Sequence, residues 1–255
     1  MPSVPGRGRA LPGAAKAAPI GREVGYTDFA EARAIARGTM KRLLPLIAAL
    51  VLALSSARTA RAQDTHRDAT WGTVTTVTAV TALGTQVFMP RVFYAEPETT
   101  VGWRARWHVS ALAPTMTLAV LTFANEYALK DAIKSARPGC DDTNQGTGNC
   151  QDYGSLSSHA FLATSSFGNG LVVFLVDTYK WSDGRFNAGS FTGNVVLPVL
   201  LAAVTDVGRA AGNWESGGQV AVSSLTGLAF GALTGFAFAS LARPECGYSG
   251  VSLCW

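Results

Sequence analysis

Long apolar segments separated by short polar stretches dominate the chain after its first sixty residues, and five of them are found at roughly 71–90, 107–129, 159–178, 190–207 and 218–242. The last segment has no charged residue from Gln219 to Ala242, which is long enough to cross a bilayer as a helix. It carries Gly227, Gly231 and Gly235 at four-residue intervals, a spacing typical of helices that pack closely in lipid. The pattern predicts an all-α, membrane-embedded bundle of about five helices.

The first apolar segment is ambiguous, because Thr and Val alternate from Thr73 to Thr78 as they would in a strand. Its length and its lack of charge favour a helix. The tryptophans flank the apolar segments, as aromatic belts at two membrane interfaces do, and they are Trp71, Trp103, Trp107, Trp181, Trp214 and Trp255. The alternative is a soluble periplasmic helical domain, which would be expected to bury some tryptophans within its helices.

An export signal precedes these segments. The cationic start Met40-Lys41-Arg42 is followed by an apolar core over residues 43–54 and by Ala-Arg-Ala at 60–62, a cleavage signature. This order is typical of a secretory signal peptide, and an uncleaved signal anchor is the alternative.

The chain therefore divides into an upstream extension (1–39), a signal peptide (40–62) and one helical domain (63–255). The extension is rich in Ala, Gly, Pro and Arg without sustained periodicity, so we interpret it as disordered or as a mis-assigned start. Residues 1–62 hold 10 of the 21 Lys+Arg and 3 of the 17 Asp+Glu, which leaves the domain with a formal charge of −3. That division removes the main support for a nucleic-acid partner.

Four cysteines follow the leader, and an even number behind an export signal favours disulfides. Of the three possible pairings we favour the two local ones, Cys140–Cys150 and Cys246–Cys254, because both close short loops. No Cys-x2-Cys pair and no histidine cluster indicates a metal site, and nothing in the sequence implies a cofactor.

Five crossings after a cleaved leader would begin outside and end inside. The predicted inner segments hold most of the domain's basic residues, in agreement with the positive-inside rule, namely Arg91, Arg104, Arg106, Lys180, Arg185 and Arg243. The outer basic residues are Lys130, Lys134, Arg137 and Arg209. This topology predicts a bacterial inner-membrane protein whose outer loops face the periplasm. It also places Cys246 and Cys254 on the reducing side, which conflicts with their pairing.

The outer cations suggest a binding site. Lys130 and Arg137 are seven residues apart, about two turns of helix, so we expect both on one helical face with Lys134 between them. Pro138 should end that helix, because the residue before a proline is pushed out of the α region. The structural alternative is a solvated helix terminus that the helix dipole stabilises.

A second polar element opens the third apolar segment with Ser157, Ser158 and His159. Side-chain hydroxyls and free backbone N–H groups at a helix start can bind an anion, although a serine there can also serve only as a cap. Basic side chains, hydroxyl donors and a histidine at neighbouring helix ends favour a phosphate-type oxyanion site.

Lys130-x6-Arg137-Pro138 followed by Leu156-Ser157-Ser158-His159 resembles the first two motifs of the type 2 phosphatidic acid phosphatase and vanadium haloperoxidase superfamily. The second motif usually reads Pro-Ser-Gly-His in that superfamily, so two of its four positions match here. The third motif, Ser-Arg-x5-His-x3-Asp, corresponds to the stretch Gly208 to Gln219. Arg209 matches its arginine, but Glu215 and Gln219 replace its histidine and aspartate.

The resemblance implies a helical membrane phosphatase for lipid phosphates of the phosphatidic acid or polyprenyl pyrophosphate type, acting without a metal. The phosphate would be held by Lys130, Arg137 and Arg209, with Ser157 and Ser158 as further donors and His159 as general acid. Its implied partners are a lipid phosphate or another phosphate ester and the bilayer itself.

The replaced nucleophile predicts an impaired catalytic site. Glu215 is a weaker nucleophile towards phosphorus than an imidazole and repels a phosphate dianion. Losing an essential nucleophile commonly lowers turnover on the order of a million-fold. Glu215 would instead neutralise Arg209 and close the pocket. Two other functions therefore stay open: a non-catalytic protein that binds a phospholipid or phosphate headgroup, and a purely structural helical membrane protein.

Overall fold

The computed structural model describes residues 66–95, 102–106, 109–141, 143–144, 146–154 and 156–241. Within these residues the chain forms five long helices and one two-stranded hairpin. The first long helix is α2 (Ala69–Phe88). The second is α3 (Val109–Ala124), which continues through the π-helical turn η1 (Asn125–Leu129) into α4 (Lys130–Ile133), and the third is α5 (Ser158–Tyr179). The fourth is α6 (Ala188–Phe191), which continues through the π-helical turn η3 (Thr192–Val196) into α7 (Leu197–Ala211), and the fifth is α8 (Gly217–Leu241). The short 3-10 turn η2 (Gly148–Cys150) lies in the loop before α5. The all-α prediction is therefore confirmed at the level of secondary structure.

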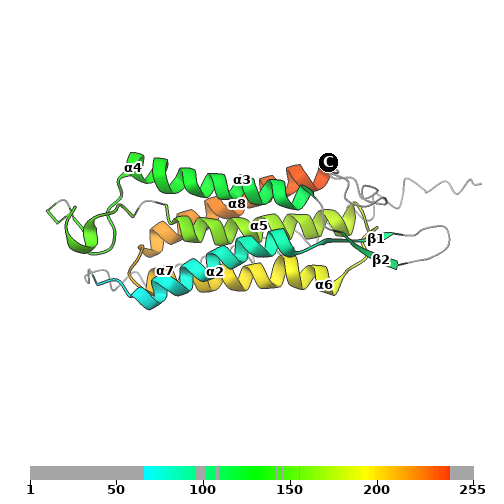
Figure 1. Cartoon of the computed structure of the whole chain (residues 1–255), viewed down its shortest axis with the longest axis horizontal. Coiled ribbons are helices and arrows are strands. Elements are labelled where there is room, and N and C mark those ends of the chain that lie inside the picture. Colours follow the sequence, from blue (N-terminus) through cyan, green and yellow to red (C-terminus); the bar gives the residue numbers. More distant parts are fainter. Residues whose placement is uncertain are drawn as a thin grey trace, which may run out of the picture.

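The helices run up and down along one long axis (Figure 1). Helix α5 lies at the centre and packs against α2, α3, α7 and α8. The starts of α2, α5 and α8 and the ends of α4 and α7 meet at one end of the bundle, whereas the hairpin lies at the other (Figure 1). The fold thus brings the motifs that the sequence separates to one end.

Glycines allow α8 to lie directly against α5. A Cβ atom added to Gly231 would stand 2.0 Å from the carbonyl oxygen of Ser165, and one on Gly235 would stand 2.8 Å from that of Asn169. A Cβ on Gly227 would meet the carbonyl oxygen of Phe161 at 2.6 Å. The predicted small-residue face is therefore a helix–helix contact.

The apolar core beside this contact is built from small side chains. Ala79 and Ala82 of α2, Ala163 of α5 and Ala202 of α7 are buried together, and Leu162 and Leu201 pack against them. Small residues let three helix backbones approach one another closely, which is how helices associate in lipid without a hydrophobic driving force.

Three of the helices are long and apolar enough to cross a membrane: Ser158–Tyr179, Ala188–Ala211 and Gly217–Leu241. Helices α2 and α3 were also expected to cross but are not among the three. Threonines make α2 less apolar. The apolar run of α3 ends at the polar residues Asn125 and Glu126, which shortens its apolar stretch.

The segment between the first two helices was expected to be a loop and instead contains an antiparallel hairpin of β1 (Arg91–Ala95) and β2 (Gly102–Arg106). Tyr94 pairs with Trp103, and their rings meet edge to face at 5.3 Å. The Arg185 guanidinium lies 3.7 Å from the centre of the Tyr94 ring. The alternation of apolar and polar residues in so short a hairpin is a weak signal, so the sequence did not predict these strands.

The predicted disulfide Cys140–Cys150 is present and lies in the loop between α4 and α5. Cys246, Cys254, the predicted signal peptide and the upstream extension lie outside the described residues.

Candidate functional site

The helix that carries Lys130 ends earlier than its sequence indicates. Helix α4 stops at Ile133, and Lys134 adopts a left-handed conformation with φ of 51°. The expectation that Lys130, Lys134 and Arg137 share one helical face is therefore wrong. The chain turns away four residues before Arg137, which then points into the bundle end from a non-helical segment, with 6% of its surface exposed.

The two arginines of the first and third motifs meet at one carboxylate. The Arg209 guanidinium donates through both Nε and Nη2 to the two oxygens of Glu215, which is the bidentate geometry that arginine prefers. Arg137 Nη1 lies 3.4 Å from Glu215 Oε1 and donates to the carbonyl oxygen of Trp214 at 2.7 Å. Glu215 is 1% exposed. Glu215 thus lies between the two arginines.

A third arginine, which the sequence did not single out, belongs to the same cluster. Arg67 precedes α2, and its guanidinium lies 5.4 Å from the centre of the Trp214 ring. The Arg209 guanidinium lies 4.9 Å from the centre of that ring. Burial, and then the charge of Arg137, lower the pKa of Arg67, although Asp152 and Glu215 act in the opposite direction. Arg67 therefore lies near two other guanidinium groups and two carboxylates, and its own charge gives the group an excess of one positive charge.

Two donors in this cluster have no acceptor. Arg67 Nη2 and Arg137 Nε are both buried, and neither has a hydrogen-bond partner among the described residues. Buried donors are normally satisfied, so each of these two N–H groups can take a further acceptor. We call Arg67, Arg137, Arg209, Trp214 and Glu215 the arginine cluster.

Lys130 belongs to a separate ion pair. Its Nζ atom donates to Glu126 Oε2 at 2.5 Å, and the Ser158 hydroxyl bonds to the same oxygen at 2.5 Å. Asn125 Nδ2 also donates to the Ser158 hydroxyl, at 3.0 Å. The Glu126–Lys130 pair is visible in the sequence as an i, i+4 pair of opposite charges, which sequence reasoning could have used.

The remaining motif residues have local partners. Ser157 caps α5, because its hydroxyl accepts from the backbone N–H of Ala160 at 3.3 Å. His159 Nε2 lies 3.0 Å from the Thr76 hydroxyl. The imidazole is within electrostatic range of both charged groups, Arg209 with Glu215 and Lys130 with Glu126. His159 therefore lies between the arginine cluster and the Glu126–Lys130 pair.

Gln219 caps the start of α8. Its Oε1 accepts from the backbone N–H of Ser216 at 2.8 Å, and the Ser216 hydroxyl accepts from the backbone N–H of Gln219 at 3.3 Å. This is a capping box, and its Ser-x-x-Gln signature was readable in the sequence. Gln219 Nε2 also donates to Ser135 and Ala136, which holds the chain after α4 against α8.

A groove opens between α2, α3 and α5 beside His159, with a volume of about 310 Å³. Its walls are mainly apolar, and Glu126, Ser158 and His159 lie at one end. None of the three arginines of the arginine cluster lines it.

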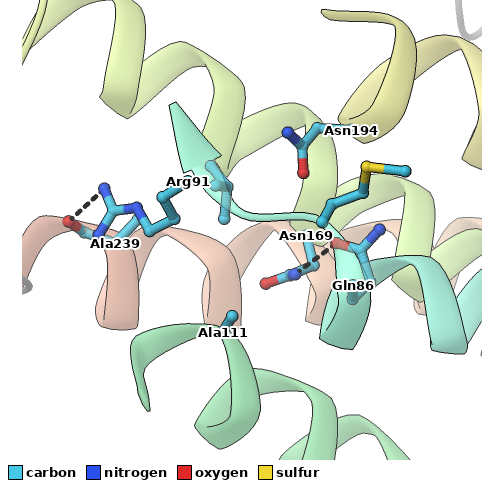
Figure 2. Close-up of a pocket in the computed structure, with 8 residues that line it drawn as sticks. Gln86, Arg91, Ala111, Asn169, Asn194 and Ala239 are labelled. Carbon is cyan, nitrogen blue, oxygen red and sulfur yellow. Dashed lines mark hydrogen bonds between the residues drawn. The ribbon is translucent and has the colours of Figure 1, made fainter. Parts of the chain in front are cut away.

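A second buried polar region occupies the hairpin end of the bundle. Arg91 donates to Asp177 through Nε at 3.0 Å and also through Nη2. Beside it, Asn169 Nδ2 donates to Gln86 Oε1 at 2.8 Å, next to a cavity of about 10 Å³ (Figure 2). A cavity of that size holds about one water molecule. Arg91 lies in the segment between α2 and α3, as predicted, and is buried in a pair with Asp177.

Within the described residues, no three His, Cys, Asp or Glu side chains converge as metal ligands. No protein-family model, curated protein or solved structure matches the chain.

Proposed function

We propose that the protein is a membrane-embedded, non-catalytic protein that binds a phosphate-type anion at the arginine cluster, on the side of the membrane facing the periplasm. The ligand would be the headgroup of a lipid phosphate or another phosphate ester. The observation that carries the proposal is the charge of the cluster. Two guanidinium groups contact one buried carboxylate and a third lies nearby, and two of the buried N–H groups have no acceptor among the described residues.

The unpaired donors define where the anion would bind. Arg67 Nη2 and Arg137 Nε are the free atoms, and of the charged groups that act on Arg67, Arg137 acts most strongly. Even with the exposed Asp152 counted, the cationic groups exceed the carboxylates by one. A phosphate bound there would make charge-assisted hydrogen bonds to two guanidinium groups, the strongest class of such bonds in proteins.

The same geometry argues against hydrolysis. Attack on phosphorus requires a nucleophile with a free lone pair directed at the substrate, and both Glu215 oxygens are engaged by Arg209. The Glu215 carboxylate occupies the place that the resemblance assigns to the phosphate, between the arginines of the first and third motifs. We therefore favour binding over turnover.

The test uses the purified protein in lipid nanodiscs that contain phosphatidic acid and phosphatidylcholine. Native mass spectrometry should show retention of phosphatidic acid over phosphatidylcholine, and Arg137→Ala should weaken that retention about tenfold or more. Release of inorganic phosphate should be absent from the wild-type protein. Glu215→His combined with Gln219→Asp supplies the histidine and the aspartate of the third motif beside Arg209, and we expect measurable release from this variant.

The single variant Gln219→Asp controls for changes in the α8 cap. Phosphate release by the wild-type protein would contradict the non-catalytic assignment. Equal retention of both lipids, or retention indifferent to Arg137→Ala, would show that the cluster is structural. A well-folded double variant without turnover would count against the alignment of the third motif.

A further inference from the structure

The groove beside His159 differs chemically from the arginine cluster. Leu83, Phe123 and Leu162 are among its apolar lining residues, from α2, α3 and α5. Phe123 and Tyr127 stack at 6.1 Å with an angle of 9° between their planes, and they are 63% and 71% exposed. An apolar groove whose aromatic edge is open to the surroundings of the bundle suits a hydrocarbon chain.

The polar end of the groove offers an acceptor. Glu126 lies on the π-helical turn η1, a local irregularity that often marks functional positions. Its Oε2 already accepts from Lys130 and Ser158, whereas its Oε1 accepts from none of the described residues. The side chain is 39% exposed. A ligand chain in the groove would thus place its head beside a carboxylate oxygen that lacks a donor.

The charged residues at this end of the groove determine which ligand headgroup can bind there. A phosphate would face the Glu126 carboxylate at close range, with no arginine of the cluster in the lining to compensate it. An ammonium head would face Lys130, whose Nζ already pairs with that carboxylate. A hydroxyl meets neither penalty, because it donates to a charged acceptor without adding charge.

We infer that this groove binds a long-chain alcohol, with the hydrocarbon between α2, α3 and α5 and the hydroxyl donating to Glu126 Oε1. The site is separate from the phosphate site proposed above and does not depend on it. A neutral lipid with a free hydroxyl at its head has the required chemistry.

The experiment uses the full protein in phosphatidylcholine nanodiscs with two probes of equal chain length: hexadecan-1-ol and hexadecyl phosphate, each carrying a diazirine in mid-chain. After photolysis, mass spectrometry locates the labelled residues. The alcohol should label the peptides containing Leu83, Phe123 and Leu162, and the phosphate should label them at least tenfold less. Glu126→Ala should reduce labelling by the alcohol about tenfold, the loss expected for one hydrogen bond to a charged acceptor.

Matched variants separate the groove from general lipid contact. Ala119→Phe fills the groove and should abolish the labelling, whereas Ala237→Phe makes the same change at an exposed position of α8. Asp131→Ala removes an exposed carboxylate near Glu126 and should leave labelling unchanged. Equal labelling of the groove and of the exposed face of α8 would mean adventitious chain contact only and would overturn the inference. Labelling that is indifferent to Glu126→Ala, or equal for both probes, would overturn it as well, whether or not Ala119→Phe folds.

Discussion

The two ends of the bundle both bury arginines, but their charges are balanced differently. At the hairpin end, Arg91 meets Asp177 one to one, and both side chains are almost fully buried. At the opposite end, Arg137 and Arg209 share Glu215, and Arg67 adds a third positive charge. The first pair compensates itself within the chain, whereas the second group leaves donors unpaired.

By our proposal, this difference separates a structural charge from an anion-binding site. A buried ion pair that satisfies itself holds β1 against α5 and needs nothing from outside. A buried group with excess positive charge is costly unless an anion joins it, because charges inside a membrane bundle are retained where they have a partner. The comparison predicts that the two ends respond differently to mutation and to phosphate.

The largest effect should come from breaking the balanced pair. Asp177→Ala leaves the Arg91 guanidinium buried without its carboxylate, which should lower the free energy of unfolding by about 3–5 kcal/mol. Thermal unfolding in detergent, followed by circular dichroism, measures the change. The double variant Arg91→Met with Asp177→Leu should recover most of the loss, since apolar replacement of a whole buried pair is often neutral.

Asp183→Ala is the matched control, because Asp183 is an exposed carboxylate at the same end. Surface changes of this kind usually stay within about 0.5 kcal/mol. A loss for Asp177→Ala no larger than that of the control would show that the pair does not stabilise the fold.

The second largest effect, rescue of a variant by added phosphate, should occur at only one end of the bundle. Glu215→Ala removes the carboxylate between Arg137 and Arg209 and should destabilise the protein, but added phosphate can take the vacated place. At a phosphate concentration one hundred times its dissociation constant, the recovered stability should be about 2.7 kcal/mol. The unfolding temperature with and without phosphate measures it.

Asp177→Ala supplies the comparison for that rescue. In that variant Arg91 lacks the Asp177 carboxylate, and it lies in the core beside a cavity of about 10 Å³, too small for a phosphate ion. Phosphate should therefore leave its unfolding temperature unchanged. Equal rescue of both variants would point to a general salt effect, and rescue of neither would remove the basis for an anion site.

The sequence predicted the helices closely, and particular residues explain why. Long apolar runs define α5, α7 and α8, and the glycine spacing of α8 identified its contact face. The order of the segments also predicted that Arg137, Arg209 and Glu215 would come to one end. These features depend on periodicity and on the order of elements, which a single sequence contains.

What the sequence could not supply was the choice of partner for each charge. Lys130 was expected beside Arg137, but it pairs with Glu126, its i, i+4 neighbour, and α4 ends at Ile133 before it reaches Arg137. Arg67 was overlooked, since it lies far from the motifs in sequence and reaches the site only through the packing of α2 against α7. The Arg67 contact follows from tertiary packing and has no local signature, whereas the Glu126–Lys130 pair has one in its i, i+4 spacing.

The most direct test is a calorimetric titration of inorganic phosphate into the wild-type protein in phosphatidylcholine nanodiscs. The account predicts one saturable site per chain, weakened about tenfold by Arg67→Ala, because that change removes one of two charge-assisted donors. Arg185→Ala, which removes an exposed arginine at the hairpin end, should leave the affinity unchanged. Absence of a saturable site, or an affinity equally insensitive to both changes, would contradict the claim that the arginine cluster binds an anion.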